Sequence, residues 1–236
     1  MPTPKKLAII QSNYIPWRGY FDIIGSVDEF ILYDEVQYTR RDWRNRNKIK
    51  TPQGLLWLTI PVQVKGKYEQ AIRDTVISEP RWAEKHWRAI CQNYAKAPFF
   101  REYKPQFEEL YLGCAETYLS LINHRFLTAI CSVLGIRTSI RWSTDYPAKE
   151  QGKNERLIEL CRKAGASEYL SGPAARDYLD EGLFRRSGIA VSYADYSGYR
   201  EYPQPHPPFE GAVSILDLIF CTGPQAREYL KSVAPR

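Results

Sequence analysis

The chain has 236 residues, of which 44% are hydrophobic, 25% charged and 14% aromatic. This composition excludes a mainly disordered chain, because disordered chains carry few aromatic residues. A net charge of +6 favours an anionic partner without identifying its class. No apolar run approaches the roughly 18 residues of a membrane span, and no signal-peptide core follows the start, so a soluble cytoplasmic protein is expected.

The cysteines and histidines indicate neither a disulfide framework nor a metal site. The five cysteines are widely spaced in apolar stretches without a C-x-x-C pair, and the three histidines are scattered. We therefore expect reduced, buried thiols and no bound metal.

The hydrophobic pattern alternates between strand and helix periods, which predicts an α/β protein with an open, mainly parallel sheet. We expect one α/β domain over 1–236, with a helical insertion at 80–135. A hairpin is predicted from segments 55–64 and 71–78 around the turn at 65–67. In chain order, the pattern predicts strands at 7–11, 29–33, 136–142, 168–170 and 189–193, and helices at 19–26, 80–94, 107–112, 115–134, 154–163, 174–186 and 214–221, with a last helix ending at Val233.

Three positions support these helix boundaries. Asn154 and Ser214 are suited to N-caps, and Gly165 is suited to a C-cap.

The segment 11–20 (QSNYIPWRGY) directly follows the first predicted strand, where open α/β sheets bind ligands. A glycine at the head of the next helix would let a phosphate approach free N–H groups, and the neighbouring arginine would add charge. The alternative is a loop that Tyr14 and Trp17 fasten to the core. The predicted ligand-binding residues here are Gln11, Tyr14, Trp17, Arg18, Gly19 and Tyr20.

The segment 39–50 (TRRDWRNRNKIK) carries six cations and one carboxylate. It could bind phosphate, and Trp43 among the cations raises the alternative of single-stranded nucleic acid. One aromatic is a poor stacking platform, and the rest of the chain is nearly neutral, so a compact anion such as a nucleotide diphosphate is favoured over nucleic acid. A solvated surface loop is the other alternative. The predicted binding residues are Arg44, Arg46, Asn47 and Lys48.

A third group of polar residues lies toward the C-terminus, where Ser171, Tyr178 and Gln204 are candidates for substrate binding. Ser214 and Asp217 fit the first turn of a helix equally well. The sequence contains no G-x-S-x-G elbow, no G-x-x-x-x-G-K-[ST] loop and no H-E-x-x-H pair, so no common catalytic motif assigns a reaction.

Several uncommon strings together resemble the WbqC-like protein family over nearly the whole chain: QSNYIPWRGYFDII, DEFILYDEVQYTRRDWRNRNKIKT, WLTIPV, RLIELCRKAGASEYLSG and SILDLIF. The family opening resembles QPxYxPWxGYF, and Ser12 stands where proline is usual. The resemblance implies a role in O-antigen and lipopolysaccharide biosynthesis. It also implies a transferase that moves an acyl or aminoacyl group from a thioester or acyl-carrier donor to the amino group of a nucleotide-linked amino sugar.

The N-terminal strand, loop and Gly-Tyr pair are also similar to the opening of nucleotidyltransferase-like, Rossmann-type α/β proteins. In those proteins a Gly-His pair begins the helix, and the position of the histidine corresponds to Tyr20. A phenol carries no positive charge near neutral pH. The similarity therefore implies nucleotide binding without nucleotidyl transfer.

Acylation of an amine needs a base for the ammonium proton and donors for the developing oxyanion. Their positions beyond strand ends favour Asp34 as the base and Asn13 or Gln37 as the donor. We expect the basic segment to fold over the first loop and form a joint receptor for a phosphorylated small molecule. The alternative function is a non-catalytic nucleotide or nucleotide-sugar binding protein.

Overall fold

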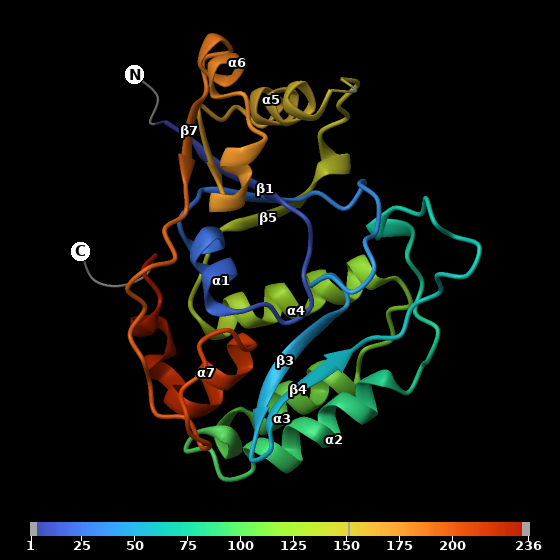
Figure 1. The fold of residues 1–236 in the computed structure, drawn as a ribbon, viewed down its shortest axis with the longest axis vertical. Helices are drawn as coiled ribbons and strands as arrows, with labels where there is room; N and C mark the ends of the chain where they lie inside the picture. Colours follow the sequence, from blue (N-terminus) through green and yellow to red (C-terminus); the bar gives the residue numbers. More distant parts are fainter. Residues whose placement is uncertain (1–3, 151, 233–236) are drawn as a thin grey trace.

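The computed structural model of the protein describes residues 4–150 and 152–232. Five strands form one sheet in the order β5-β2-β1-β6-β7, and every neighbouring pair is parallel (Figure 1). If the five strands of this sheet are numbered 1 to 5 as they occur in the chain, their order in the sheet is 3-2-1-4-5. This order is typical of doubly wound α/β folds. The predicted parallel α/β sheet is thus confirmed. Its strands are β1 (Lys6–Ile10), β2 (Glu29–Leu32), β5 (Ser139–Trp142), β6 (Glu168–Ser171) and β7 (Ala190–Tyr193).

Seven α-helices occur in residues 4–150 and 152–232, all at or near the predicted places. They are α1 (Arg18–Gly25), α2 (Trp82–Tyr94), α3 (Phe100–Leu112), α4 (Leu119–Val133), α5 (Lys153–Lys163), α6 (Glu181–Arg186) and α7 (Ile215–Thr222). None of the helices in this described part of the chain has the length and apolarity needed to cross a bilayer.

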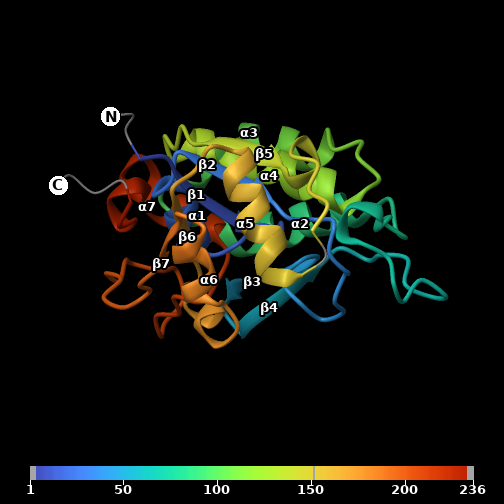
Figure 2. The ribbon, with the colours of Figure 1, turned by 90° about the horizontal axis from the view of Figure 1, so that it is seen from above.

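Helices cover both faces of the sheet (Figures 1 and 2). On one face, Leu7 and Ile9 of β1 pack in a cluster with Leu160 of α5 and Phe184 of α6. The intervening Ala8 points to the larger cluster, which contains residues of α1, α4 and α7 and also of α2 and α3. Burial on both faces explains why β1 appears in the sequence as a continuous apolar run.

An antiparallel hairpin of β3 (Arg46–Thr51) and β4 (Gly54–Thr59) lies between β2 and β5 in the chain. The predicted hairpin around 65–67 is therefore wrong, because segment 55–59 pairs with the basic segment. Val62 and Ile77 form only an isolated bridge. The true turn places Gly54 at φ +113°, a conformation that favours glycine.

Helices α3, α4 and α5 start at other residues than predicted, and α4 begins at Leu119 rather than at Ala115. Helix α3 includes Pro105 rather than starting after it. Gly152, not Asn154, occupies the N-cap of α5, and the Asn154 side chain instead accepts a hydrogen bond from the backbone N–H of Asp180 at 3.1 Å.

The predicted helix at 174–186 is divided into a 3-10 helix, η3 (Pro173–Asp177), and α6. Asp180 caps α6, because its carboxylate accepts from the backbone N–H of Leu183 at 2.9 Å. The last predicted helix is a 3-10 helix, η4 (Gly223–Tyr229), and its predicted end at Val233 lies outside the described residues. The predicted N-cap at Ser214 is confirmed, whereas Ala164 is the C-cap of α5 and Gly165 follows it at φ +70°.

Candidate functional site

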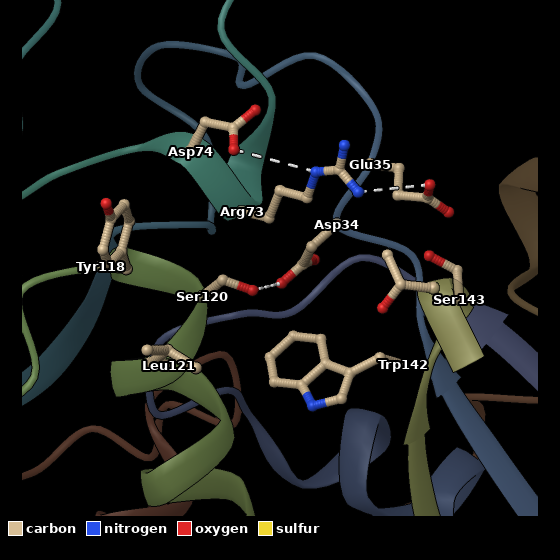
Figure 3. A pocket seen from close by; sticks show the side chains of 10 residues that line it. Asp34, Glu35, Arg73, Asp74, Tyr118, Ser120, Leu121, Trp142 and Ser143 are labelled. Atoms are coloured by element: carbon tan, nitrogen blue, oxygen red, sulfur yellow. Dashed lines mark hydrogen bonds and ion pairs between the residues drawn. The ribbon is translucent and has the colours of Figure 1, made fainter.

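A cavity of about 390 Å³ lies beyond the carboxyl ends of β2 and β5, an edge of the sheet where α/β proteins bind ligands (Figure 3). Two further segments close it, the start of α4 and the 3-10 helix η1 (Ile72–Asp74). We call this the Asp34 cavity. It is lined by Asp34, Glu35, Arg73, Asp74, Tyr118, Ser120, Leu121, Trp142, Ser143 and Thr144.

Asp34 directly follows Tyr33 at the end of β2, and only 1% of its surface is exposed. Its carboxylate accepts hydrogen bonds from the backbone N–H of Ser12 at 2.8 Å and from the Ser120 hydroxyl. Burial raises the pKa of the Asp34 carboxyl above its usual value, although these hydrogen bonds and the nearby Arg44 oppose the rise. A buried carboxylate with a raised pKa is a suitable proton acceptor.

The first turn of α4 contributes free backbone donors to the cavity wall. The N–H of Leu119 is bonded to the carbonyl of Thr75, and the N–H of Ile122 to that of Tyr118. The N–H groups of Ser120 and Leu121 find no acceptor among the described residues. Because the N-terminal end of a helix carries partial positive charge, these two groups are suited to an anionic oxygen.

The remaining walls combine an indole with charged groups. Figure 3 shows the Trp142 indole on one side of the Asp34 carboxylate and the Arg73 side chain on the other. Glu35 forms ion pairs with Arg73 at 3.4 Å and with Arg156 at 3.1 Å. With three carboxylates against one arginine, the lining suits a ligand with hydroxyl or ammonium groups better than a polyanion.

The model of the WbqC-like protein family matches residues 11–229 of the chain. The chain belongs to the WbqC-like protein family. It is also 56% identical, over 227 residues, to the protein named "Uncharacterized protein Rv1507c" of Mycobacterium tuberculosis (strain ATCC 25618 / H37Rv), with 96% of this chain and 98% of the relative covered. No solved structure matches the chain.

In this WbqC-like protein, the basic segment lies against the first loop, as the sequence predicts. The Arg44 guanidinium donates to the carbonyls of Gln11 and Ser12 at 3.3 and 3.5 Å and to the side-chain oxygen of Asn13. The backbone N–H of Tyr14 bonds to the carbonyl of Trp43 at 3.1 Å. Arg44 therefore fastens the loop instead of facing a phosphate.

The predicted phosphate position at the head of α1 is filled by protein. A Cβ added to Gly19 would overlap the Trp17 indole, which covers this end of the helix. Arg18 is 5% exposed, donates to the carbonyl of Arg200 at 2.7 Å and lies 4.4 Å from the Tyr199 ring. The Trp17 indole thus packs against Gly19, and the Arg18 guanidinium is engaged by protein groups.

Two of the predicted binding tyrosines are buried and fasten the loop, in line with the structural alternative. The Tyr14 hydroxyl lies 2.9 Å from Nδ1 of His86 and donates to the Tyr111 hydroxyl at 3.0 Å. The Tyr20 hydroxyl donates to the carbonyl of Gln11 at 2.9 Å.

The two predicted oxyanion donors do not reach the Asp34 cavity. Asn13 lines a second cavity, of about 210 Å³, together with Trp17 and Asn47. Gln37 donates to the carbonyl of Tyr68 at 2.9 Å and lines a separate cavity.

The other predicted binding residues are dispersed. Ser171 is buried, with its hydroxyl 3.4 Å from that of Tyr169, whereas Tyr178 is 61% exposed. Gln204 accepts from Lys50 at 3.1 Å and donates to Asp217 at 2.7 Å, within a buried network. None of the three lines the Asp34 cavity.

Arg46 and Lys48 project from the hairpin beside Trp57. The Arg46 guanidinium lies 4.2 Å from the indole centre, and the Lys48 ammonium lies 5.7 Å from it. Within residues 4–150 and 152–232, no three His, Cys, Asp or Glu side chains form a group that could hold a metal ion.

Several cavity residues of the WbqC-like protein are not predicted from its sequence, including Ser120, Arg73 and Trp142. Trp142 ends a predicted strand, so the strand-end rule that selected Asp34 would also have found it. Ser120 and Arg73 carry no comparable signal, because tertiary packing alone brings their segments to the sheet edge.

Proposed function

We propose that this WbqC-like protein transfers an acyl or aminoacyl group to the amino group of a nucleotide-linked amino sugar, as a step in surface-polysaccharide biosynthesis. The single observation that supports this best is the buried Asp34 carboxylate in a cavity rich in carboxylates at the carboxyl edge of the sheet. A nucleotidyltransferase-like ancestry of the fold is part of the same proposal, since that fold suits a nucleotide-linked substrate.

The lining offers complementary groups for an amino sugar. The Trp142 indole provides an apolar surface for one face of a sugar ring, and Glu35 and Thr144 can bond to its hydroxyls. An ammonium group would then be attracted to Asp34, the most buried carboxylate of the lining.

In the proposed step, the Asp34 carboxylate takes a proton from the sugar ammonium and later releases it to solvent. The free amine attacks the carbonyl carbon of a thioester donor, so that a C–N bond forms and the C–S bond breaks. The electron pair leaves with sulfur, and the thiolate takes the second proton lost by nitrogen. The raised pKa of Asp34 makes it a better base than an ordinary aspartate.

The donors for the developing oxyanion are proposed to be the backbone N–H groups of Ser120 and Leu121. They replace Asn13 and Gln37, which lie in other cavities. Pre-oriented backbone donors at a helix N-terminus suit this task because they need no rearrangement during the reaction.

The test is mass spectrometry of nucleotide-linked amino sugars incubated with acyl and aminoacyl thioesters. We expect acylated product with the wild type and a rate at least about 100-fold lower with Asp34→Asn. Asp74→Asn is the matched control, since Asp74 also lines the cavity but its side chain is 62% exposed. Equal rates for wild type and Asp34→Asn would contradict the assignment of the base.

The second candidate is a non-catalytic nucleotide-sugar binding protein. It is favoured by Tyr20, which stands where the nucleotidyltransferase-like enzymes carry a histidine and whose hydroxyl donates to the carbonyl of Gln11. Saturable binding of the same acceptors without turnover of any donor pair would support this candidate over the transferase.

A further inference from the structure

The second cavity has lining chemistry suited to a flat aromatic ring. Its volume is about 210 Å³, and two indoles, a proline and two side-chain amides contribute to its walls. We call it the indole slot. It is lined by Asn13, Pro16, Trp17, Trp43, Asn47 and Ala212.

One wall of the indole slot, Trp43, lies beside cationic and aromatic side chains of the hairpin. Trp43 is 42% exposed and lies 5.5 Å, ring centre to ring centre, from Trp57 of β4. The Lys48 ammonium lies 5.9 Å from the Trp43 ring centre and, with Arg46, beside Trp57. An exposed indole flanked by cations is suited to stack a base and to attract its phosphates.

The acidic groups nearest the slot are already engaged. Asp42 accepts hydrogen bonds from the Thr39 hydroxyl at 2.6 Å and from the N–H of Trp43 at 2.7 Å, and it pairs with Arg44. Glu210 accepts from the backbone N–H of Ala212 at 2.7 Å. Lys48 forms no ion pair among the described residues, so its charge is free for an anion.

We infer that the indole slot binds the base of a nucleoside diphosphate, with the base stacked on Trp43 and the phosphates near Lys48 and Arg46. The side-chain amide of Asn13 can provide a hydrogen bond to the base edge, because Arg44 occupies only its oxygen. Trp17 also lines the slot and adds apolar surface for the base.

This inference rests on the proposed function, since it assigns a place to the nucleotide part of the same acceptor. The two cavities adjoin the first loop at consecutive residues: the N–H of Ser12 donates to Asp34, and Asn13 lines the indole slot. A nucleotide-linked amino sugar has the two chemical parts that these two cavities would bind.

The test is isothermal titration of the full-length protein with nucleoside diphosphates, free nucleosides and inorganic pyrophosphate. We expect saturable binding of a nucleoside diphosphate and at least about tenfold weaker binding by Trp43→Ala, the loss expected for one stacked base. Lys48→Gln should weaken binding and reduce its salt dependence. Tyr68→Ala, an exposed aromatic that lines neither the Asp34 cavity nor the indole slot, is the control and should leave the affinity unchanged.

Two results would overturn the inference: no binding of any nucleoside diphosphate at millimolar concentration, or equal affinities for wild type and Trp43→Ala. A base with phosphates could come from a nucleoside diphosphate or from a nucleic acid, and titration with single-stranded oligonucleotides distinguishes the two. If they bind more tightly than the nucleoside diphosphate with a steeper salt dependence, the slot serves nucleic acid and the assignment to a nucleoside diphosphate is wrong.

Activity separates this inference from the proposed function. If acyl transfer occurs, Trp43→Ala should raise KM for the nucleotide-linked acceptor and leave KM for the same amino sugar without its nucleotide unchanged. An unchanged KM for both acceptors would refute nucleotide binding in the indole slot but would leave the proposed transferase function intact. Nucleoside diphosphate binding that depends on Trp43, without any acyl transfer, would support the indole slot and refute the transferase function.

Discussion

At the scale of single residues, the buried charge of Asp34 opposes folding while serving the proposed reaction. Burial raises its pKa in the folded state above its value in the unfolded chain. The folded protein therefore holds this proton more firmly, and stability falls as pH rises from the unfolded pKa of about 3.9 through the folded pKa. Carboxylates kept in such positions commonly serve catalysis.

We predict that Asp34→Asn is at least as stable as the wild type near neutral pH. The amide keeps an acceptor for the N–H of Ser12 but carries no charge. Urea unfolding should show this advantage shrinking as the pH falls below the folded pKa of Asp34, because the wild-type carboxyl is then neutral too. A variant that is less stable at neutral pH would mean that the ionised carboxylate stabilises the fold.

Gly19 offers a second prediction for a single residue. Inside helix α1, alanine alone would be favoured over glycine by up to about 1 kcal/mol. The overlap with the Trp17 indole should reverse this sign, so Gly19→Ala should lower the free energy of unfolding by about 1–3 kcal/mol.

Gly172→Ala is the matched control for Gly19→Ala. Its new Cβ would lie 3.7 Å from the Tyr196 hydroxyl, an ordinary contact. Equal stabilities of the two variants in urea unfolding would show that the Trp17 indole can move aside without lowering the free energy of unfolding.

At the scale of elements, the first loop is held between the sheet and the helices that follow the hairpin. Tyr14 bonds to His86 of α2, and the second ring nitrogen of His86 lies 3.2 Å from the carbonyl of Thr59 in β4. Burial lowers the pKa of His86 to about 4. Because burial disfavours the imidazolium, the ring that joins the loop, α2 and β4 is neutral near pH 7.

We predict that this contact makes folding sensitive to acid. The unfolded chain binds a proton at the usual histidine pKa of about 6.5, so stability is full above that value and is lost as pH falls toward 4. Between about pH 7 and pH 5, the wild type should lose about 2 kcal/mol more stability than His86→Gln. Equal losses in urea unfolding would contradict a buried neutral His86.

The hairpin shows what the sequence could not predict. Strands β1 and β2 are apolar runs and were found. Strand β3 was missed because two of its inward positions, Asn47 and Thr51, are polar, so it shows no alternation of apolar residues. Asn47 is buried because it donates to the carbonyl of Ile15 at 2.9 Å, a contact that exists only once the loop is folded.

In the candidate site, too, only the residues marked by the local sequence could be predicted. Asp34 could be predicted because it directly follows an apolar strand, and ligands bind beyond the carboxyl ends of parallel strands. Ser120 could not be predicted, because it lies 86 residues after Asp34 in the chain and only the folded structure brings the two side chains together. Arg44 was correctly placed beside the first loop, but its hydrogen bonds to backbone carbonyls were not predictable from its charge.

At the scale of the whole molecule, a buried polar network joins the hairpin to the C-terminal helix. Asp217 of α7 accepts from the hydroxyls of Tyr94 and Tyr202 at 2.7 and 2.8 Å and from Gln204 at 2.7 Å. Gln204 in turn accepts from Lys50 of β3. The sheet side and the helical segment also share one hydrophobic cluster, so we expect them to unfold together.

We predict that Asp217→Ala lowers the free energy of unfolding by at least about 3 kcal/mol, because two buried tyrosine hydroxyls and the partly buried amide of Gln204 lose their acceptor at once. Asp195→Ala is the control, since the Asp195 side chain is 73% exposed. Circular dichroism and tryptophan fluorescence should report one coincident transition for the wild type. Two separate transitions would show that the helical segment folds independently.

The proposed function requires the Asp34 cavity to hold the amino group of the acceptor. A crystal structure of the protein soaked with a nucleotide-linked amino sugar would show where that group binds. We expect the amine nitrogen within hydrogen-bonding distance of the Asp34 carboxylate and the sugar ring against Trp142. A fully occupied sugar bound elsewhere, with the Asp34 cavity unchanged, would contradict it.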